Sequence, residues 1–196
     1  MNTHDDLAVT NMEKNVGVKE MPTVGEHQAV LAQAHNIGHE TYQGRVNTDP
    51  TAVLVFELEQ KMTGGQMNGK PMVISDRFPM NMAPGSKLRN MVDAWRAPKP
   101  PLSDAEARVF SIRQLLAVPC TLIVLHKAKK NTTGNRAYIG GIARAKPELP
   151  KVAATVVEVP KWITEEKEKN RDNQPPPAGA SSAPSGQPHN QDDLPF

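Results

Sequence analysis

The hydrophobic pattern of this chain changes period twice, and this change most restricts the folds that the chain can adopt. Three runs with the alternation and β-branched content of strands precede one helical pattern, and two more strand runs follow it. The five strand runs are 26–37, 51–59, 70–78, 119–127 and 135–144. Between the third and fourth runs, at 86–96, apolar residues recur at i, i+3, i+4 and i+7, which predicts a helix with one buried face.

Cap and turn residues separate these elements. Ser86 is a natural N-cap for the predicted helix, and the prolines that start at Pro98 end it. Ser103 and Glu106 have the spacing of a capping box and predict a second, short helix. The pair Gly140–Gly141 inside the last strand run predicts a bulge or a close approach of another chain or a ligand.

This order of elements is typical of an OB-fold. An OB-fold is a five-stranded barrel, and its helix lies between strands 3 and 4. We therefore expect a mainly β domain over residues 24–146, an OB-fold-like five-stranded barrel with a helical insertion between strands 3 and 4. Another small β-rich barrel, or a split sheet with helices on one face, stays open as an alternative.

The regions that flank 24–146 have a different composition. Residues 1–23 are polar and irregular, which indicates a flexible N-terminal arm. Residues 147–171 contain an apolar run that predicts an edge strand and a charged stretch that predicts a short helix. Residues 172–196 are rich in Pro, Gly, Ser, Ala, Gln and Asn, a composition that cannot bury enough apolar surface to fold, so we expect a disordered tail.

The sequence favours a soluble, cytoplasmic protein. No apolar run approaches the roughly 20 residues needed to span a bilayer, and the first residues lack the apolar core of a secretory signal. The single cysteine, Cys120, excludes an intramolecular disulfide and lies in an apolar run, so we interpret it as a small buried hydrophobe.

Signatures of catalysis are missing from the sequence. The glycine pairs lack the lysine and the strand-to-helix context of a phosphate loop, and there is no HExxH motif. We interpret His27, His35 and His39 as surface or loop histidines rather than metal ligands. We therefore expect no enzymatic activity, no cofactor and no metal.

Charge is segregated along the chain. Residues 1–23 carry a net charge of −2, residues 24–146 carry +7 and residues 147–196 carry −3. A basic body with acidic ends suggests that the body attracts a polyanion, although a chance excess of surface cations is an equal alternative.

Several of these cations lie beside aromatic residues, the combination that binds single-stranded nucleic acid. Three aromatic–basic pairs are candidates for base stacking, with simple packing as an equal alternative for each. The basic hairpin between strands 4 and 5 is one of the loops that OB-folds use for ligands. We expect the other aromatics, Phe56 and Trp95, in the core. The candidate nucleic-acid-binding residues are Tyr42, Arg45, Arg77, Phe78, Lys127, Lys129, Lys130, Arg136, Tyr138 and Arg144.

The last five residues, Asp192, Asp193, Leu194, Pro195 and Phe196, follow a Pro/Gly/Gln-rich linker. This ending resembles the C-terminal tail of bacterial single-stranded DNA-binding proteins. The resemblance implies that the tip binds helicases, primase factors, nucleases and recombination proteins rather than DNA. Phe196 would fill an apolar pocket, its α-carboxylate would meet a basic residue, and the two aspartates would steer docking.

The body more closely resembles a family of small phage early-region proteins. The resemblance is carried by Gly-Glu-His at Gly25, a Lys-Leu-Arg helix that ends in Ala94-Trp95-Arg96, and Pro-Cys followed by an apolar strand that ends in His126-Lys127. It spans roughly residues 24–146 and implies an OB-fold that binds single-stranded DNA.

Together these features predict a phage-type protein of the host cytoplasm that binds single-stranded DNA without sequence preference. It would protect the strand during replication and recombination, recruit partners through its tip and bind no membrane. A recombination mediator or annealing protein is one alternative, and an adaptor that mimics the tail without binding DNA is another. Homo-oligomerisation stays open.

Overall fold

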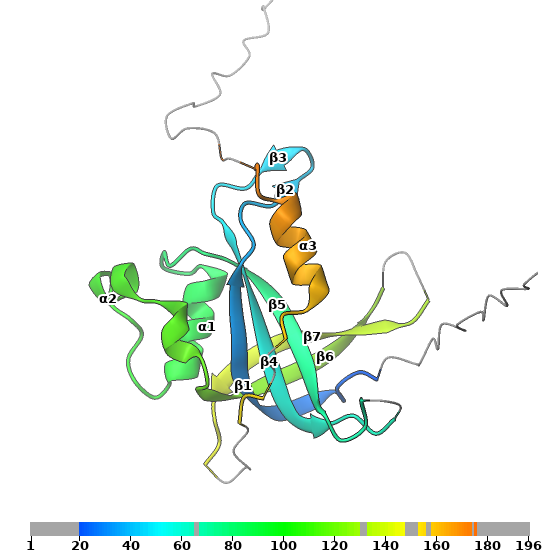
Figure 1. Ribbon diagram of the computed structural model, residues 1–196. Helices are drawn as coiled ribbons and strands as arrows, with labels where there is room; N and C mark the ends of the chain where they lie inside the picture. Colours follow the sequence, from blue (N-terminus) through cyan, green and yellow to red (C-terminus); the bar gives the residue numbers. More distant parts are fainter. Residues whose placement is uncertain are drawn as a thin grey trace, which may run out of the picture.

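The computed structural model describes residues 20–64, 67–129, 133–147, 153–155, 158–173 and 175. The body is mainly β, with one five-stranded antiparallel sheet in the order β5–β4–β1–β6–β7 (Figure 1). Its strands are β1 (Gly25–Asn36), β4 (Thr51–Lys61), β5 (Pro71–Pro79), β6 (Pro119–Ala128) and β7 (Asn135–Arg144). Each coincides with one of the five predicted strand runs, so the predicted order of strands is confirmed.

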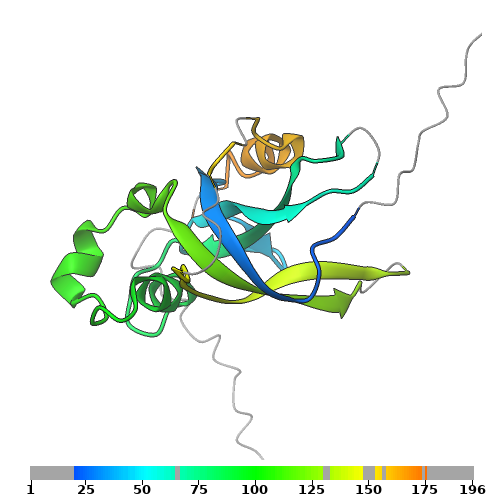
Figure 2. The ribbon, with the colours of Figure 1, turned by 90° about the horizontal axis from the view of Figure 1, so that it is seen from below.

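The two edge strands of this sheet come close to each other. β1 is central and pairs with both β4 and β6, while β5 and β7 form the edges and approach one another without a hydrogen-bonded ladder in the described part. Helix α1 (Lys87–Arg96) contacts both edge strands. The sheet is therefore strongly bent, and α1 lies where its edges meet (Figure 2).

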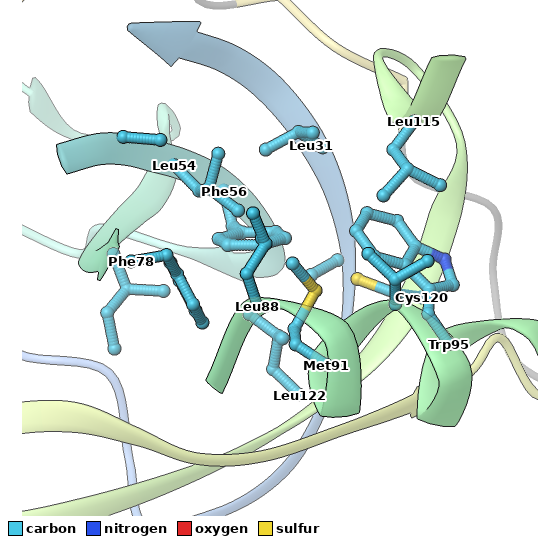
Figure 3. Packing of buried hydrophobic residues seen from close by; sticks show 14 of the residues in the cluster. Leu31, Leu54, Phe56, Phe78, Leu88, Met91, Trp95, Leu115, Cys120 and Leu122 are labelled. Carbon is cyan, nitrogen blue, oxygen red and sulfur yellow. The ribbon is translucent and has the colours of Figure 1, made fainter. Parts of the chain in front are cut away.

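The core lies between the inner face of the bent sheet and the helices. The N-cap Ser86 accepts a hydrogen bond from the backbone N–H of Arg89, as expected for the predicted helix start. The rings of Phe56 and Trp95 pack with centroids 5.9 Å apart, which confirms that both are core residues. Figure 3 shows the packing of Leu31, Leu54, Phe56, Phe78, Leu88, Met91, Trp95, Leu115, Cys120 and Leu122. Burial raises the pKa of the Cys120 thiol, which confirms the interpretation of this cysteine as a buried hydrophobe.

A short helical segment connects α1 to β6. It contains α2 (Asp104–Val109) and a 3₁₀ helix (Ile112–Leu115). The predicted capping box is present: Ser103 Oγ accepts from the backbone N–H of Glu106, whose carboxylate accepts from the backbone N–H of Ser103. The backbone N–H and the hydroxyl of Ser103 both donate to the Glu106 carboxylate, and these two bonds lower the pKa of Glu106.

A small hairpin that the sequence did not predict lies between β1 and β4. Its strands are β2 (Thr41–Tyr42) and β3 (Arg45–Val46), which pair antiparallel. A positive φ at Gln43 and Gly44 makes the tight turn between them.

The described residues 153–155 and 158–173, called here the C-terminal layer, lie against the outer face of the sheet, which is turned away from the core (Figure 1). They include α3 (Lys161–Lys169), which corresponds to the predicted short helix. In the predicted edge strand at 152–159, the residues that the structure describes are not in a strand.

The end of the predicted N-terminal arm is also bound to the body. Among residues 20–23, the Glu20 carboxylate accepts from the backbone N–H of Thr63, and the carbonyl oxygen of Pro22 lies 2.7 Å from His126 Nε2. Residues 1–19 lie outside the described part.

Candidate nucleic-acid interface

The hairpin formed by β6 and β7 brings cations and an aromatic ring together on its outer face. Lys127 is opposite Arg136 in the ladder, and Leu125 is opposite Tyr138, so these four side chains share one face. Lys127 Nζ lies 4.5 Å from the centroid of the Tyr138 ring. Ile139, of opposite parity, packs against the core. Arg136 and Tyr138 therefore share the face that strand parity predicted.

The glycine pair in β7 leaves room on this face for side chains of β6. The ladder shifts between Ile123 and Val124, and Gly140 is the extra residue, which confirms the predicted bulge. A Cβ on Gly140 would lie 2.5 Å from Leu125 Cδ1, and a Cβ on Gly141 would lie 3.2 Å from Ile123 Cδ1. The space beside both glycines is thus filled by side chains of the neighbouring strand β6.

Ile123, Leu125 and Tyr138 form what we call the apolar shelf. Ile123 is 39% exposed, and Leu125 and Tyr138 are half-buried. Sequence reasoning missed Ile123 and Leu125, because both belong to a continuous apolar run that resembles a core strand. The glycine pair was the available signal, since two adjacent glycines in a strand leave room for side chains of the next strand.

An acidic residue borders the shelf on the β1 side. Glu26 is opposite Ile123 in the ladder between β1 and β6. Its carboxylate forms an ion pair with Lys146 Nζ, so a cation compensates this negative charge beside the shelf.

The other predicted cations of this region are distributed differently. Lys129 is exposed, and its backbone N–H bonds to the carbonyl oxygen of Gly134 at 3.0 Å. Arg144 is opposite Cys120, whose side chain is in the core, so it does not share a face with Arg136. Lys130 lies outside the described residues, as do Asp192, Asp193, Leu194, Pro195 and Phe196.

Tyr42 and Arg45 are brought together by the β2–β3 hairpin. They are directly opposite each other in its ladder, and Tyr42 is 69% exposed. In both Figure 1 and Figure 2 this hairpin lies away from the tip of the β6–β7 hairpin. Tyr42 and Arg45 are thus a second aromatic–basic pair, separate from that of the β6–β7 hairpin.

The third predicted pair, Arg77 with Phe78, is not a stacking site in this structure. Phe78 is 3% exposed and packs in the core, with Lys87 Nζ 4.3 Å from its ring centroid. Adjacent strand residues point to opposite faces, so Arg77 and Phe78 cannot act on one ligand base. The sequence prediction placed these neighbours together without applying strand parity.

Arg77 itself is engaged by groups of the same chain. Its guanidinium forms ion pairs with Glu40 and, at 3.6 Å, with Glu166 of α3. Its Cζ also lies 5.7 Å from the ring centroid of Trp162. Residues of the C-terminal layer therefore contact Arg77, which the sequence predicts to bind nucleic acid.

The layer covers the outer face of β4 as well. Ile163 of α3 is buried in a cluster with Ile37, Val53 and Val55. Glu57, on the same face as the two valines, is fully buried, and its carboxylate accepts hydrogen bonds from the backbone N–H and the hydroxyl of Thr155.

The histidines differ in part from their sequence interpretation. His27 is buried, not exposed: Nδ1 lies 3.0 Å from Glu59 Oε1 and Nε2 lies 2.8 Å from the carbonyl oxygen of Thr23, because residues 20–24 fold against the sheet. Burial, and secondarily the charge of Lys167, lowers the pKa of His35. Within the described ranges, no group of three or more His, Cys, Asp or Glu side chains could hold a metal ion.

Comparisons with protein-family models, with curated proteins and with solved structures returned no match. None of the helices in the described ranges is long and apolar enough to cross a membrane.

Proposed function

We propose that this chain is a non-catalytic protein that binds single-stranded DNA without sequence preference and protects it during phage DNA replication and recombination. The observation that carries the proposal is the grouping of Lys127, Arg136 and Tyr138 on one face of the β6–β7 hairpin. Cations that follow a backbone and a ring on which a base stacks are the parts that such binding requires.

The order of the strands supports an OB-fold for this body. β1 pairs with both β4 and β6, the edge strands β5 and β7 approach each other, and α1 lies between β5 and β6 in sequence. A five-stranded, partly open barrel with these connections is an OB-fold. On that assignment, the β2–β3 hairpin lies in the first ligand loop and the turn of the β6–β7 hairpin is the second, and both carry predicted binding residues.

Partner recruitment is assigned to the C-terminal tip, Asp192–Phe196. The two aspartates would steer docking to a basic surface, and Leu194, Pro195 and Phe196 would fill an apolar pocket. The resemblance of this ending to bacterial single-stranded DNA-binding proteins, and of the body to phage early-region proteins, supports enzymes of replication and recombination as the partners.

Fluorescence anisotropy with labelled oligo-dT, oligo-rU and duplex DNA across a salt series tests this function. We expect a preference for the single strand and a fall in log affinity with log salt, with a slope of about −0.7 for each phosphate contacted. Equal affinity for duplex, or no salt dependence, contradicts the proposal.

Two further measurements separate the alternatives. Accelerated annealing of complementary oligonucleotides would assign the chain to strand pairing rather than passive coating. Absence of DNA binding at every salt concentration, together with binding of partners through the tip, would assign it to an adaptor.

A further inference from the structure

We propose that the bases of the bound strand lie on the apolar shelf, Ile123, Leu125 and Tyr138, and that the C-terminal layer keeps the adjoining outer face of β4 closed to nucleic acid. This inference rests on the proposed function and assigns that function to one part of the sheet.

The glycines of β7 leave the shelf without side chains that would separate Ile123 from Leu125. Leu125 lies over Gly140 and Ile123 over Gly141, and neither glycine has a side chain that projects between them. Tyr138 extends the same row, since it is opposite Leu125. Apolar side chains and an aromatic ring accept any base, because every base has a face that can stack, so contact here carries no sequence preference.

Charge is arranged to guide a phosphate backbone along this row. Lys127 and Arg136 stand at the Tyr138 end, and the acid at the other end, Glu26, is ion-paired with Lys146. A single strand can lay its bases on the shelf while its phosphates meet the cations. In a duplex the bases are paired inside the stack and cannot reach the shelf, which gives selectivity for the single strand.

The covered part of the face has the opposite character. Beneath the C-terminal layer, β4 offers Val53, Val55 and Glu57, with neither a cation nor an aromatic ring among them. Removing the layer would place the Glu57 carboxylate in the middle of the face, where it would repel phosphates. Thr155 of the layer donates hydrogen bonds to this carboxylate, and these bonds make the layer a fixed part of the domain.

Two exposed apolar residues provide a matched test. Ile123 of β6 is 39% exposed and Val73 of β5 is 37% exposed, and both belong to strands of the same sheet. Val73 is opposite Glu57, beside the covered part of the face. We expect Ile123→Ser to weaken oligo-dT binding about threefold or more, because apolar contact with the bases is lost. The slope of log affinity against log salt should stay unchanged, because no phosphate contact is removed. Val73→Ser should bind as the wild type does.

A variant that is expected to gain affinity distinguishes the loss of a contact from misfolding, because a misfolded protein does not bind more tightly. Ile123→Phe adds a ring to the shelf and should tighten binding about fivefold or more, whereas Val73→Phe should have no effect. If the wild type binds oligo-dT but the Ile123 and Val73 variants behave alike, or Ile123→Phe fails to tighten binding, the shelf is wrong while the proposed function stands. If the wild type does not bind single strands, both proposals fail.

Discussion

The outer face of the sheet has two halves, one covered by the C-terminal layer and one exposed. Over β4, Val53, Val55 and Glu57 are buried beneath the C-terminal layer. Over β6 and β7, Ile123 and its neighbours remain at the surface, flanked by Lys127. One strand from each half, β4 and β6, pairs with β1, so position next to β1 does not distinguish the halves. The difference comes from a segment about one hundred residues further along the chain than β4, which covers one half and leaves the other open to a ligand.

The largest expected effect comes from breaking the covered half. Ile163→Ala removes a buried side chain from the cluster that fixes α3 to the sheet, and should lower the free energy of unfolding by about 2–5 kcal/mol. Urea denaturation measures this loss. The exposed neighbour is the control, because Thr164→Ala should change the free energy by no more than about 0.5 kcal/mol. Equal stability of the two variants would mean that the layer is not part of the folded body.

An intermediate effect is expected from the open half. Alanine at both Lys127 and Arg136 removes two phosphate contacts and should reduce the magnitude of the salt slope by about 1.4, with about tenfold weaker binding at low salt. Lys161 and Lys169, exposed cations of α3, supply the matched control. Their double alanine variant should retain the wild-type slope in the same anisotropy titration. A slope that falls equally in both variants would show that cation number, not position, governs affinity.

The smallest effect concerns the pH dependence of the covered half. His35 is opposite Val53, and burial followed by the charge of Lys167 lowers its pKa below the ordinary value of 6.5. Protonation is thus harder in the folded state, so this contribution to stability is complete above pH 6.5 and is lost as pH falls through the lowered pKa. Urea midpoints measured at pH 7.5 and pH 5 should differ less in His35→Gln than in the wild type. An unchanged difference would exclude His35 as a source of acid sensitivity.

The elements that the sequence predicted are those encoded by local pattern. The strand runs and the helix at 86–96 have periods that can be counted along the chain. The caps at Ser86 and Ser103 depend on residues at most three positions away, and both are present. The bulge at Gly140–Gly141 could be predicted for the same reason, because a glycine pair within a strand indicates a bulge without reference to distant residues.

The features that the sequence did not predict depend on which strands become neighbours. Ile123 and Leu125 look like core residues until the ladder with β7 places them outside. Ile163 meets Val53 only because the sheet and α3 are folded together. Phe78 is a stacking candidate in the sequence because its neighbour Arg77 is basic, but strand alternation sends the two side chains to opposite faces, and Phe78 packs in the core.

The hydrogen bond from Asn173 Nδ2 to the carbonyl oxygen of His39, at 2.8 Å, fixes the point at which the C-terminal layer ends. That point is at the loop between β1 and β2, on the side of α3, and the β6–β7 hairpin lies away from it in both views of the ribbon (Figures 1 and 2). In the proposed function, the layer therefore ends beside the first ligand loop, which carries Tyr42 and Arg45, and away from the apolar shelf. A strand that lies on the shelf does not meet this end of the layer, whereas a strand that extends to Tyr42 and Arg45 passes beside it.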